Sequence, residues 1–123
     1  MGKTILIVDD DPAQRRLLQA AVERNGFHTR VAENGFQAVE AVEVHADIDA
    51  VMLDLVMPGM SGQEALKEIR RRRGDLPCIV LTASGGIDTV VQAMQAGASD
   101  FFVKPASPER ILVSIRNALE LSN

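Results

Sequence analysis

The stretch Thr4-Ile5-Leu6-Ile7-Val8-Asp9-Asp10-Asp11-Pro12 contains the junction on which the fold prediction depends. Its first five residues are β-branched or apolar and predict a short strand over Thr4–Val8. A helix is expected from Pro12 to Asn25, with Asp11 as N-cap and proline at the first helical position. Gly26 is a typical stop for that helix. The junction therefore predicts a strand that runs directly into a helix.

The same alternation continues along the chain. Further strands are expected at His28–Val31, Ala50–Leu53, Cys78–Thr82 and Phe101–Val103, and helices from about Gly35, from Ser61 to near Gly74, from about Ile87 to Gly97, and from Ser107 or Pro108 to about Leu121. Ser61 and Glu64 have capping-box spacing. The short, polar strand at His28–Val31 is expected at a sheet edge. Five strands alternating with five helices predict an α/β fold with a parallel sheet that helices cover on both faces.

Helical spacing also predicts which side chains face the core. The expected inward residues are Leu18, Ala21, Val22, Phe36, Val39, Val42, Leu66, Ile69, Ile111, Leu112, Ile115 and Leu119. The basic run Arg70–Arg73 would suit a nucleic-acid contact, but cations are also favoured at the C-terminal end of a helix. We interpret this run as a solvated helix face and base no function on it.

The composition indicates one globular domain, which we expect to span residues 1–123. Apolar residues make up 46% of the chain and charged residues 24%, and the single cysteine, Cys78, excludes an intramolecular disulfide. No apolar stretch approaches the roughly 20 residues that span a bilayer, so no membrane contact is expected and the cytoplasm is the default location. A net charge of -4 without Trp or Tyr argues against direct nucleic-acid binding by this domain.

Polar residues follow four of the predicted strands. Asp9 and Asp10 follow the first strand, Asp54 the third, Thr82 ends the fourth, and Lys104-Pro105 follow the fifth. Each has an ordinary explanation, because Asp and Thr cap helices or start turns, Lys solvates loops and Pro ends strands. Together they are expected to converge at one sheet edge, where clustered carboxylates require a cation. Oxygen ligands favour Mg²⁺, and His28 and His45 fall outside the cluster as expected surface residues.

These residues also carry a family resemblance that covers essentially the whole chain. Four segments closely resemble motifs of the receiver domains of two-component response regulators: Ile5-Leu6-Ile7-Val8-Asp9-Asp10-Asp11, Asp54-Leu55-Val56-Met57-Pro58-Gly59-Met60-Ser61-Gly62, Leu81-Thr82-Ala83 and Lys104-Pro105. The resemblance implies a flavodoxin-like sheet with strand order 2-1-3-4-5. Residues 86–105 resemble, more narrowly, receivers of the sigma-54 activator (NtrC-like) type.

The resemblance also implies roles for individual residues. Asp54 is the expected phosphoacceptor. Asp10, Asp54 and the backbone carbonyl of Val56 are the expected protein ligands of Mg²⁺, and Asp9 is expected to bind the ion mainly through water. Thr82 and Lys104 are expected to neutralise phosphoryl oxygens, with a cis peptide bond between Lys104 and Pro105. Asp11 is assigned to helix capping.

The resemblance further implies that the domain works as a switch. Thr82 would move toward the phosphoryl group and Phe101 would rotate inward, altering the surface of the helix from Ile87, the strand Phe101–Val103 and the last helix. Phe101 as an ordinary core aromatic is the alternative. Val56 and Ser84 occupy positions that influence hydrolysis of the phosphoryl group, and apolar Val56 predicts a long-lived phosphorylated state.

The implied partners are a sensor histidine kinase as phosphodonor and an effector domain or partner protein, such as a transcription regulator. A homodimer that forms on phosphorylation is also implied. The domain would catalyse only its own phosphorylation and dephosphorylation.

Three alternative functions remain. The first is a haloacid-dehalogenase-like hydrolase, a class that expects a second acidic residue at the position of Val56. The others are a pseudo-receiver that accepts no phosphoryl group, and a flavodoxin.

Overall fold

A parallel sheet of five strands lies at the centre of the structure, a computed structural model that describes residues 2–83 and 85–122, with side chains up to residue 120. The strands are β1 (Thr4–Val8), β2 (His28–Ala32), β3 (Ile48–Leu53), β4 (Cys78–Thr82) and β5 (Asp100–Val103). Their order is β2-β1-β3-β4-β5, and all neighbours pair in parallel. The prediction of a flavodoxin-like sheet is confirmed, with β2 at an edge as expected.

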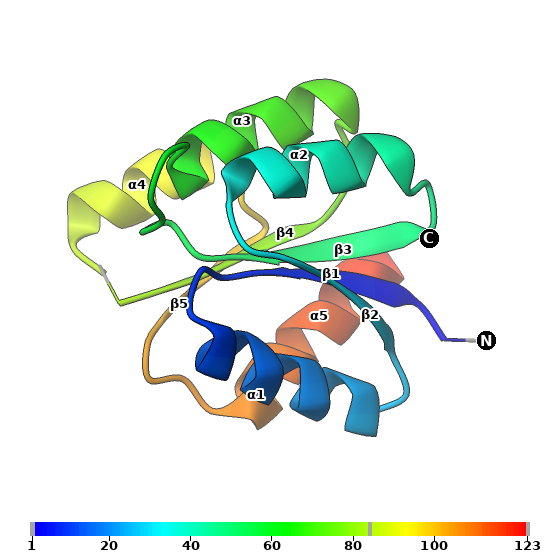
Figure 1. Cartoon of the computed structure of the whole chain (residues 1–123). Coiled ribbons are helices and arrows are strands. Elements are labelled where there is room, and N and C mark those ends of the chain that lie inside the picture. Colours follow the sequence, from blue (N-terminus) through cyan, green and yellow to red (C-terminus); the bar gives the residue numbers. More distant parts are fainter. Residues whose placement is uncertain (1, 84, 123) are drawn as a thin grey trace.

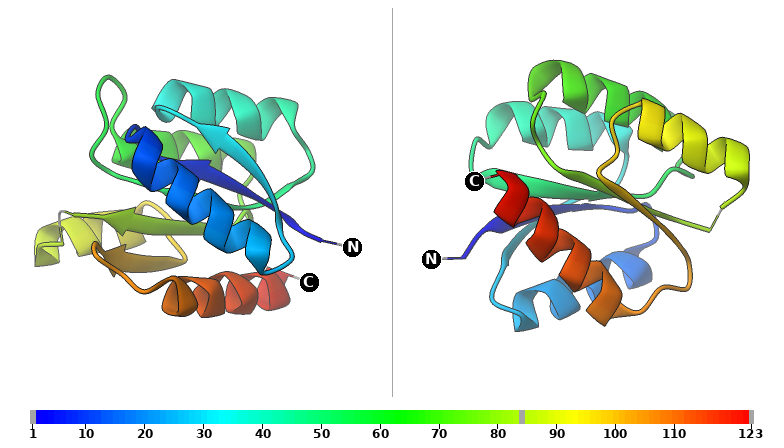
Figure 2. Two further views of the ribbon diagram at one scale, coloured as in Figure 1. Left: turned by 60° about the horizontal axis from the view of Figure 1, so that its bottom comes forward. Right: turned by 180° about the vertical axis from the view of Figure 1, so that it is seen from behind.

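Helices cover both faces of this sheet (Figure 1). The helices are α1 (Pro12–Arg24), α2 (Gly35–Val44), α3 (Gly62–Arg72), α4 (Ile87–Gln95) and α5 (Pro108–Ser122). Helices α1 and α5 lie side by side on one face, and α2, α3 and α4 cover the other, as both views in Figure 2 also show. Among the described residues, no helix combines the length and apolar character of a membrane span.

Side-chain alternation along the strands builds a separate apolar core on each face. In β1, Ile5 and Ile7 join the core beneath α1 and α5, whereas Leu6 and Val8 join the core beneath α2, α3 and α4. Successive side chains of a strand point to opposite faces, so a strand buried on both faces is a nearly continuous run of apolar or β-branched residues. All five residues of β1 are buried, which is why its sequence is an unbroken run rather than an alternating pattern.

The predicted helix caps are present. Asp11 accepts hydrogen bonds from the backbone N–H of Ala13 and Gln14, with Pro12 at the first helical position. Ser61 and Glu64 form the capping box at the start of α3. These caps satisfy N–H groups that have no partner inside the helix, and they fix the residues at which α1 and α3 begin. Both helices therefore start immediately beyond the loops that follow β1 and β3.

The prediction that Phe36 faces the core is wrong. Its side chain is 62% exposed, while Gly35, Ala38, Val39 and Val42 form the buried stripe of α2. These four positions follow the spacing of one helix face, and the residue after Gly35 is turned by about 100° away from that face. The Phe36 ring instead lies close to Gly59 in the loop between β3 and α3.

The interpretation of Arg70–Arg73 as a solvated helix face does not hold for Arg70. Its guanidinium donates to the carbonyl oxygens of Gly74 at 2.8 Å, Leu76 at 2.8 Å and Gly97 at 2.6 Å. These carbonyls lie in the loop after α3 and at the turn after α4, and the planar fork of arginine donors reaches all of them. Arg71 fits the original interpretation better, since its side chain is 74% exposed and pairs with Glu68.

Gly62 sits where α3 passes closest to the backbone that follows β3. A Cβ at this position would lie 2.4 Å from both the Asp54 carbonyl oxygen and the Leu55 Cα. Backbone atoms cannot yield as the end of a side chain can, so we expect Gly62→Ala to lower the free energy of unfolding by about 1–3 kcal/mol. Urea denaturation measures this loss.

Gly74→Ala is the matched control for that substitution. A Cβ at Gly74 would meet its nearest atom, the Arg70 carbonyl oxygen, at 3.8 Å, which is ordinary contact. Equal denaturation midpoints for the two alanine variants would contradict the close approach at Gly62.

Candidate functional site

The pairing of β1 with β3 sets the position of the site. Val8 and Leu53 are register partners, and the backbone N–H of Asp54 donates to the Val8 carbonyl at 3.0 Å. Asp9 and Asp54 therefore follow paired residues and emerge side by side at the carboxyl ends of their strands. β1 lies between β2 and β3, so the strand order reverses at this point. Ligands of open parallel sheets bind outside such a reversal.

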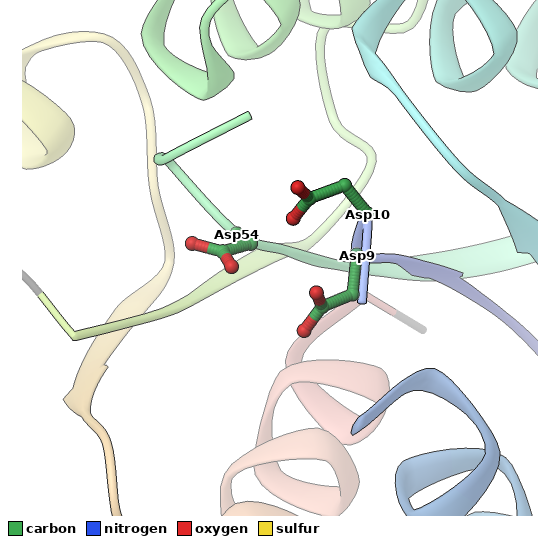
Figure 3. A group of neighbouring side chains, drawn as sticks. All are labelled: Asp9, Asp10 and Asp54. Carbon is green, nitrogen blue, oxygen red and sulfur yellow. The ribbon is translucent and has the colours of Figure 1, made fainter. Parts of the chain in front are cut away.

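Three carboxylates meet at this edge. Asp9, Asp10 and Asp54 each offer an oxygen, and these oxygens lie within 4.8 Å of one another (Figure 3). Asp9 is 2% exposed and Asp54 7% exposed, whereas Asp10 is open to solvent. The structure thus brings together the three carboxylates that the sequence predicted to converge.

Lys104 joins two of these carboxylates. Its Nζ lies 2.9 Å from Asp9 Oδ2 and 3.1 Å from Asp54 Oδ2, and its side chain is 19% exposed. Burial alone would lower the pKa of Lys104, but the hydrogen bonds to Asp9 and Asp54 outweigh it and raise the pKa above its ordinary value. The ammonium is therefore charged at neutral pH and offsets the repulsion between the two buried carboxylates.

Backbone N–H groups hold the remaining oxygens of these two carboxylates. Asp9 Oδ1 accepts from the N–H of Asp11 at 2.9 Å, and Asp54 Oδ1 accepts from the N–H of Val56 at 3.0 Å. Both donors belong to the loops that directly follow the strands. The orientation of each carboxylate is therefore fixed by a residue only two positions further along the chain. Val56 itself is 61% exposed and lines the cleft above the carboxylates with Gln14 and Ala83.

Thr82 and Lys104 are neighbours across the β4–β5 ladder. Thr82 is fully buried at the end of β4, and its carbonyl accepts from the backbone N–H of Lys104 at 2.8 Å. The peptide bond between Lys104 and Pro105 is cis. Ser84, which the sequence placed near the site, lies outside the described residues.

Phe101 is half-buried and packs against the core beneath α2, α3 and α4. It pairs with Val80 across the β4–β5 ladder, two positions before Thr82 in β4. Its ring therefore lies on the sheet face that α4 also covers. A residue that responds to a shift of α4 would have to lie on this face.

Two residues at the site were missed by the sequence analysis. Gln14 lines the cleft, and the guanidinium of Arg15 donates to the backbone carbonyl of Asp9 at 2.8 Å. Both lie in the first turn of α1, which the cap at Asp11 places against the end of β1. Their closeness to Asp11 in the sequence was the available signal, but arginine and glutamine on an amphipathic helix are usually solvent-facing.

The donor set fits Mg²⁺. The cluster consists of carboxylate oxygens, whereas Cys78 is buried in β4, which raises the pKa of its thiol to about 11. Three carboxylates and one ammonium leave two negative charges, which match a divalent cation. Mg²⁺ favours one or two carboxylates with several waters, and the exposed side of Asp10 leaves room for water.

Comparison with known proteins shows the family to which the chain is similar. A model of the response regulator receiver domain family matches residues 5–116. The chemotaxis protein CheY of Bacillus subtilis is 42% identical over 120 residues, covering 97% of this chain and 99% of CheY. The phosphate regulon transcriptional regulatory protein PhoB of Pseudomonas aeruginosa is 39% identical over 97% of this chain, which spans only 52% of PhoB.

A solved structure supports the same assignment. The crystal structure of a CheY-like receiver domain protein from Methanospirillum hungatei superimposes with a TM-score of 0.94 at 26% identity, covering 99% of this chain and 97% of that one. With a family model over most of its length and a close relative that it matches almost end to end, this chain belongs to the response regulator receiver domain family of two-component signal transduction.

Proposed function

We propose that residues 1–123 form one receiver domain that accepts a phosphoryl group on Asp54 and switches the surface of α4, β5 and α5. One observation carries the proposal: the Asp54 carboxylate follows β3 and lies beside a half-buried lysine and two further carboxylates. Phosphoryl transfer depends mainly on positioning the reactants and neutralising oxygen charge. This arrangement of a nucleophile, a cation and metal ligands suits both needs.

The reaction follows from the placement of these groups. A carboxylate oxygen of Asp54 attacks phosphorus, the N–P bond of a phosphohistidine on a sensor kinase breaks, and the electron pair returns to the imidazole nitrogen. Lys104, now bound to Asp54 Oδ2, is in reach of the oxygens that the phosphoryl group brings. Hydrolysis later reverses the modification when water attacks phosphorus and the Asp54 carboxylate leaves. In this proposal the domain catalyses only these two steps on itself.

Asp9, Asp10, Asp54 and the backbone carbonyl of Val56 would hold Mg²⁺. The bound ion supplies charge neutralisation for the phosphoryl oxygens. Lys104 remains beside Asp9 and Asp54 and keeps the two buried carboxylates compatible with one another.

The output follows from Thr82 and Phe101. The phosphoryl group adds about -1.5 to -2 charges and strong acceptors, which draw the Thr82 hydroxyl toward Asp54. Phe101 then turns into the space that Thr82 leaves, and the packing of α4 against the sheet changes. This is a population shift between two packings, with phosphorylation favouring one of them.

The proposed context is a cytoplasmic two-component pathway. A sensor histidine kinase donates the phosphoryl group, and an effector domain or partner protein, including a transcription regulator, receives the altered surface. The resemblance of residues 86–105 to sigma-54 activator receivers favours an effector with ATPase and DNA-binding parts. In a second form of output, the phosphorylated receiver dimerises through the same surface of α4, β5 and α5.

Asp54 is tested by incubating the chain with Mg²⁺ and acetyl phosphate and measuring intact mass. We expect a labile gain of one phosphoryl group in the native chain and none in Asp54→Asn, because asparagine offers no carboxylate nucleophile. Asp75→Asn is the control, since Asp75 is exposed in the loop between α3 and β4. It is expected to gain the phosphoryl group as the native chain does.

The same assay separates the alternatives. A hydrolase would release phosphate from many equivalents of donor without retaining the group, and a pseudo-receiver would show no mass gain. The first result would contradict a retained phosphoryl group and hence the switch, and the second would remove Asp54 as the phosphoacceptor.

Thr82 is tested with amide spectra recorded with and without beryllofluoride and Mg²⁺. We expect Thr82→Val to accept a phosphoryl group but to lose most of the spectral change at Phe101, because valine cannot donate to the phosphoryl oxygens. The reference is the spectrum of the same variant without beryllofluoride. An undiminished change at Phe101 would remove Thr82 from the switch.

Val56 is tested by the decay of the phosphorylated chain after the donor is removed. Its exposed, apolar side chain lines the cleft and shields phosphorus from water, so we expect several-fold faster decay in Val56→Asn. Val44→Asn is the control, because Val44 is 67% exposed at the end of α2, away from the carboxylates. Unchanged decay in Val56→Asn would refute the shielding role.

A further inference from the structure

We infer that Arg15 is a positioning residue for the metal site, which directs the Asp10 carboxylate by holding the peptide unit between Asp9 and Asp10. The inference rests on the proposed function, since it treats Asp10 as a ligand of Mg²⁺. It concerns a residue of α1 that belongs neither to the carboxylate cluster nor to the strands.

The contact is specific. Arg15 Nη1 donates to the Asp9 carbonyl oxygen at 2.8 Å, and the Arg15 side chain is only 14% exposed although it lies on a surface helix. The backbone N–H of Arg15 donates to the Asp11 carbonyl at 2.9 Å in the first turn of α1. The guanidinium is therefore turned back along the helix toward the end of β1.

The accepting oxygen belongs to the peptide unit that joins Asp9 to Asp10. A peptide unit is planar, so its carbonyl oxygen, its nitrogen and the Cα of the next residue share one plane. Holding the Asp9 carbonyl thus limits where the Asp10 Cα lies and where its side chain departs.

Asp10 needs this control more than Asp9 does. The Asp9 carboxylate is held by the N–H of Asp11 and by Lys104 Nζ. Asp10 is exposed, and within residues 2–83 and 85–122 no hydrogen bond or ion pair involves its carboxylate. The direction of that carboxylate consequently depends on the backbone from which it projects.

Glu33 supports Arg15 from the neighbouring loop. Glu33 Oε1 lies 3.5 Å from Arg15 Nη2, and the residue before it, Ala32, accepts a hydrogen bond from the Asp9 N–H at 3.2 Å. Both backbone polar groups of Asp9 are thus engaged, one by β2 and one by Arg15. Glu33 is 62% exposed, so its contribution is expected to be smaller than that of Arg15.

The charge of Arg15 and its positioning role predict opposite effects on the affinity for Mg²⁺. A cation near the cluster repels Mg²⁺, so a purely electrostatic Arg15 would weaken metal binding, and its removal would strengthen it. A positioning Arg15 strengthens metal binding, because groups that orient metal ligands typically contribute at least tenfold to affinity. The sign of the change therefore separates the two roles.

The experiment is calorimetric titration of the unphosphorylated chain with Mg²⁺. Arg15→Lys keeps the charge but loses the planar fork, and Arg15→Met loses both. We expect both to weaken Mg²⁺ binding, the lysine variant by about tenfold. Arg16→Met is the matched control, since Arg16 is the adjacent exposed arginine of the same helix, and it is expected to bind Mg²⁺ as the native chain does.

A second readout separates positioning from general stability. At saturating Mg²⁺ the Arg15 variants should reach the native maximal rate of phosphorylation by acetyl phosphate, with only the half-saturating Mg²⁺ concentration raised. Circular dichroism verifies that each variant is folded. If Arg15→Met is not folded, the Mg²⁺ affinity of Arg15→Lys alone tests the inference.

Native affinity in both Arg15 variants would overturn the inference, as would tighter binding in Arg15→Met with no change in Arg15→Lys. Both results leave the proposed function intact, because the native chain still binds Mg²⁺. Absence of Mg²⁺ binding by the native chain would instead overturn the proposed function, and this inference with it.

Discussion

Lys104 makes the burial of two carboxylates compatible with a folded protein. Asp9 and Asp54 are 2% and 7% exposed, and at 4.8 Å two such charges repel by about 3 kcal/mol at an effective dielectric near 20. One ammonium, within 3.1 Å of both, replaces this repulsion with two attractive contacts. Its raised pKa keeps it charged until the solution is strongly alkaline, so this stabilisation is present at neutral pH and is lost only as pH rises through that pKa.

Backbone hydrogen bonds of the sheet set the positions from which these three side chains project. The N–H of Asp54 is bound to β1 and the N–H of Lys104 to β4, so each functional residue follows directly from a ladder. Sites built on the ends of strands keep their geometry better than sites on long loops. The rigidity also couples the site to Thr82, because the carbonyl that holds the Lys104 backbone belongs to Thr82.

Strands, caps and the convergence of site residues could be predicted from the sequence because each depends on local chemistry. Thr4–Val8 consists only of β-branched or apolar residues, and the caps at Asp11 and Ser61 use short side chains with fixed spacing. The strand order came from family resemblance, since alternation alone leaves several orders open. Phe36, Arg70 and Arg15 could not be placed, because their contacts depend on how a helix is rotated and on which loop carbonyls come within reach.

The two carboxylates that follow β1 illustrate a division within the site. Asp9 is buried, with both oxygens bound, whereas Asp10 is exposed and its carboxylate is left to the backbone. The exposed side carries Asp10 and Val56, so in the proposed function it is the side from which a metal ion and a phosphodonor would approach. Rigidity on the buried side would fix the proposed nucleophile Asp54, while the open side would have to admit ligands and still present the Asp10 carboxylate in one direction. A contact from Arg15 to the backbone, rather than to the carboxylate itself, would meet both demands, because it would leave the Asp10 oxygens free for the proposed ion.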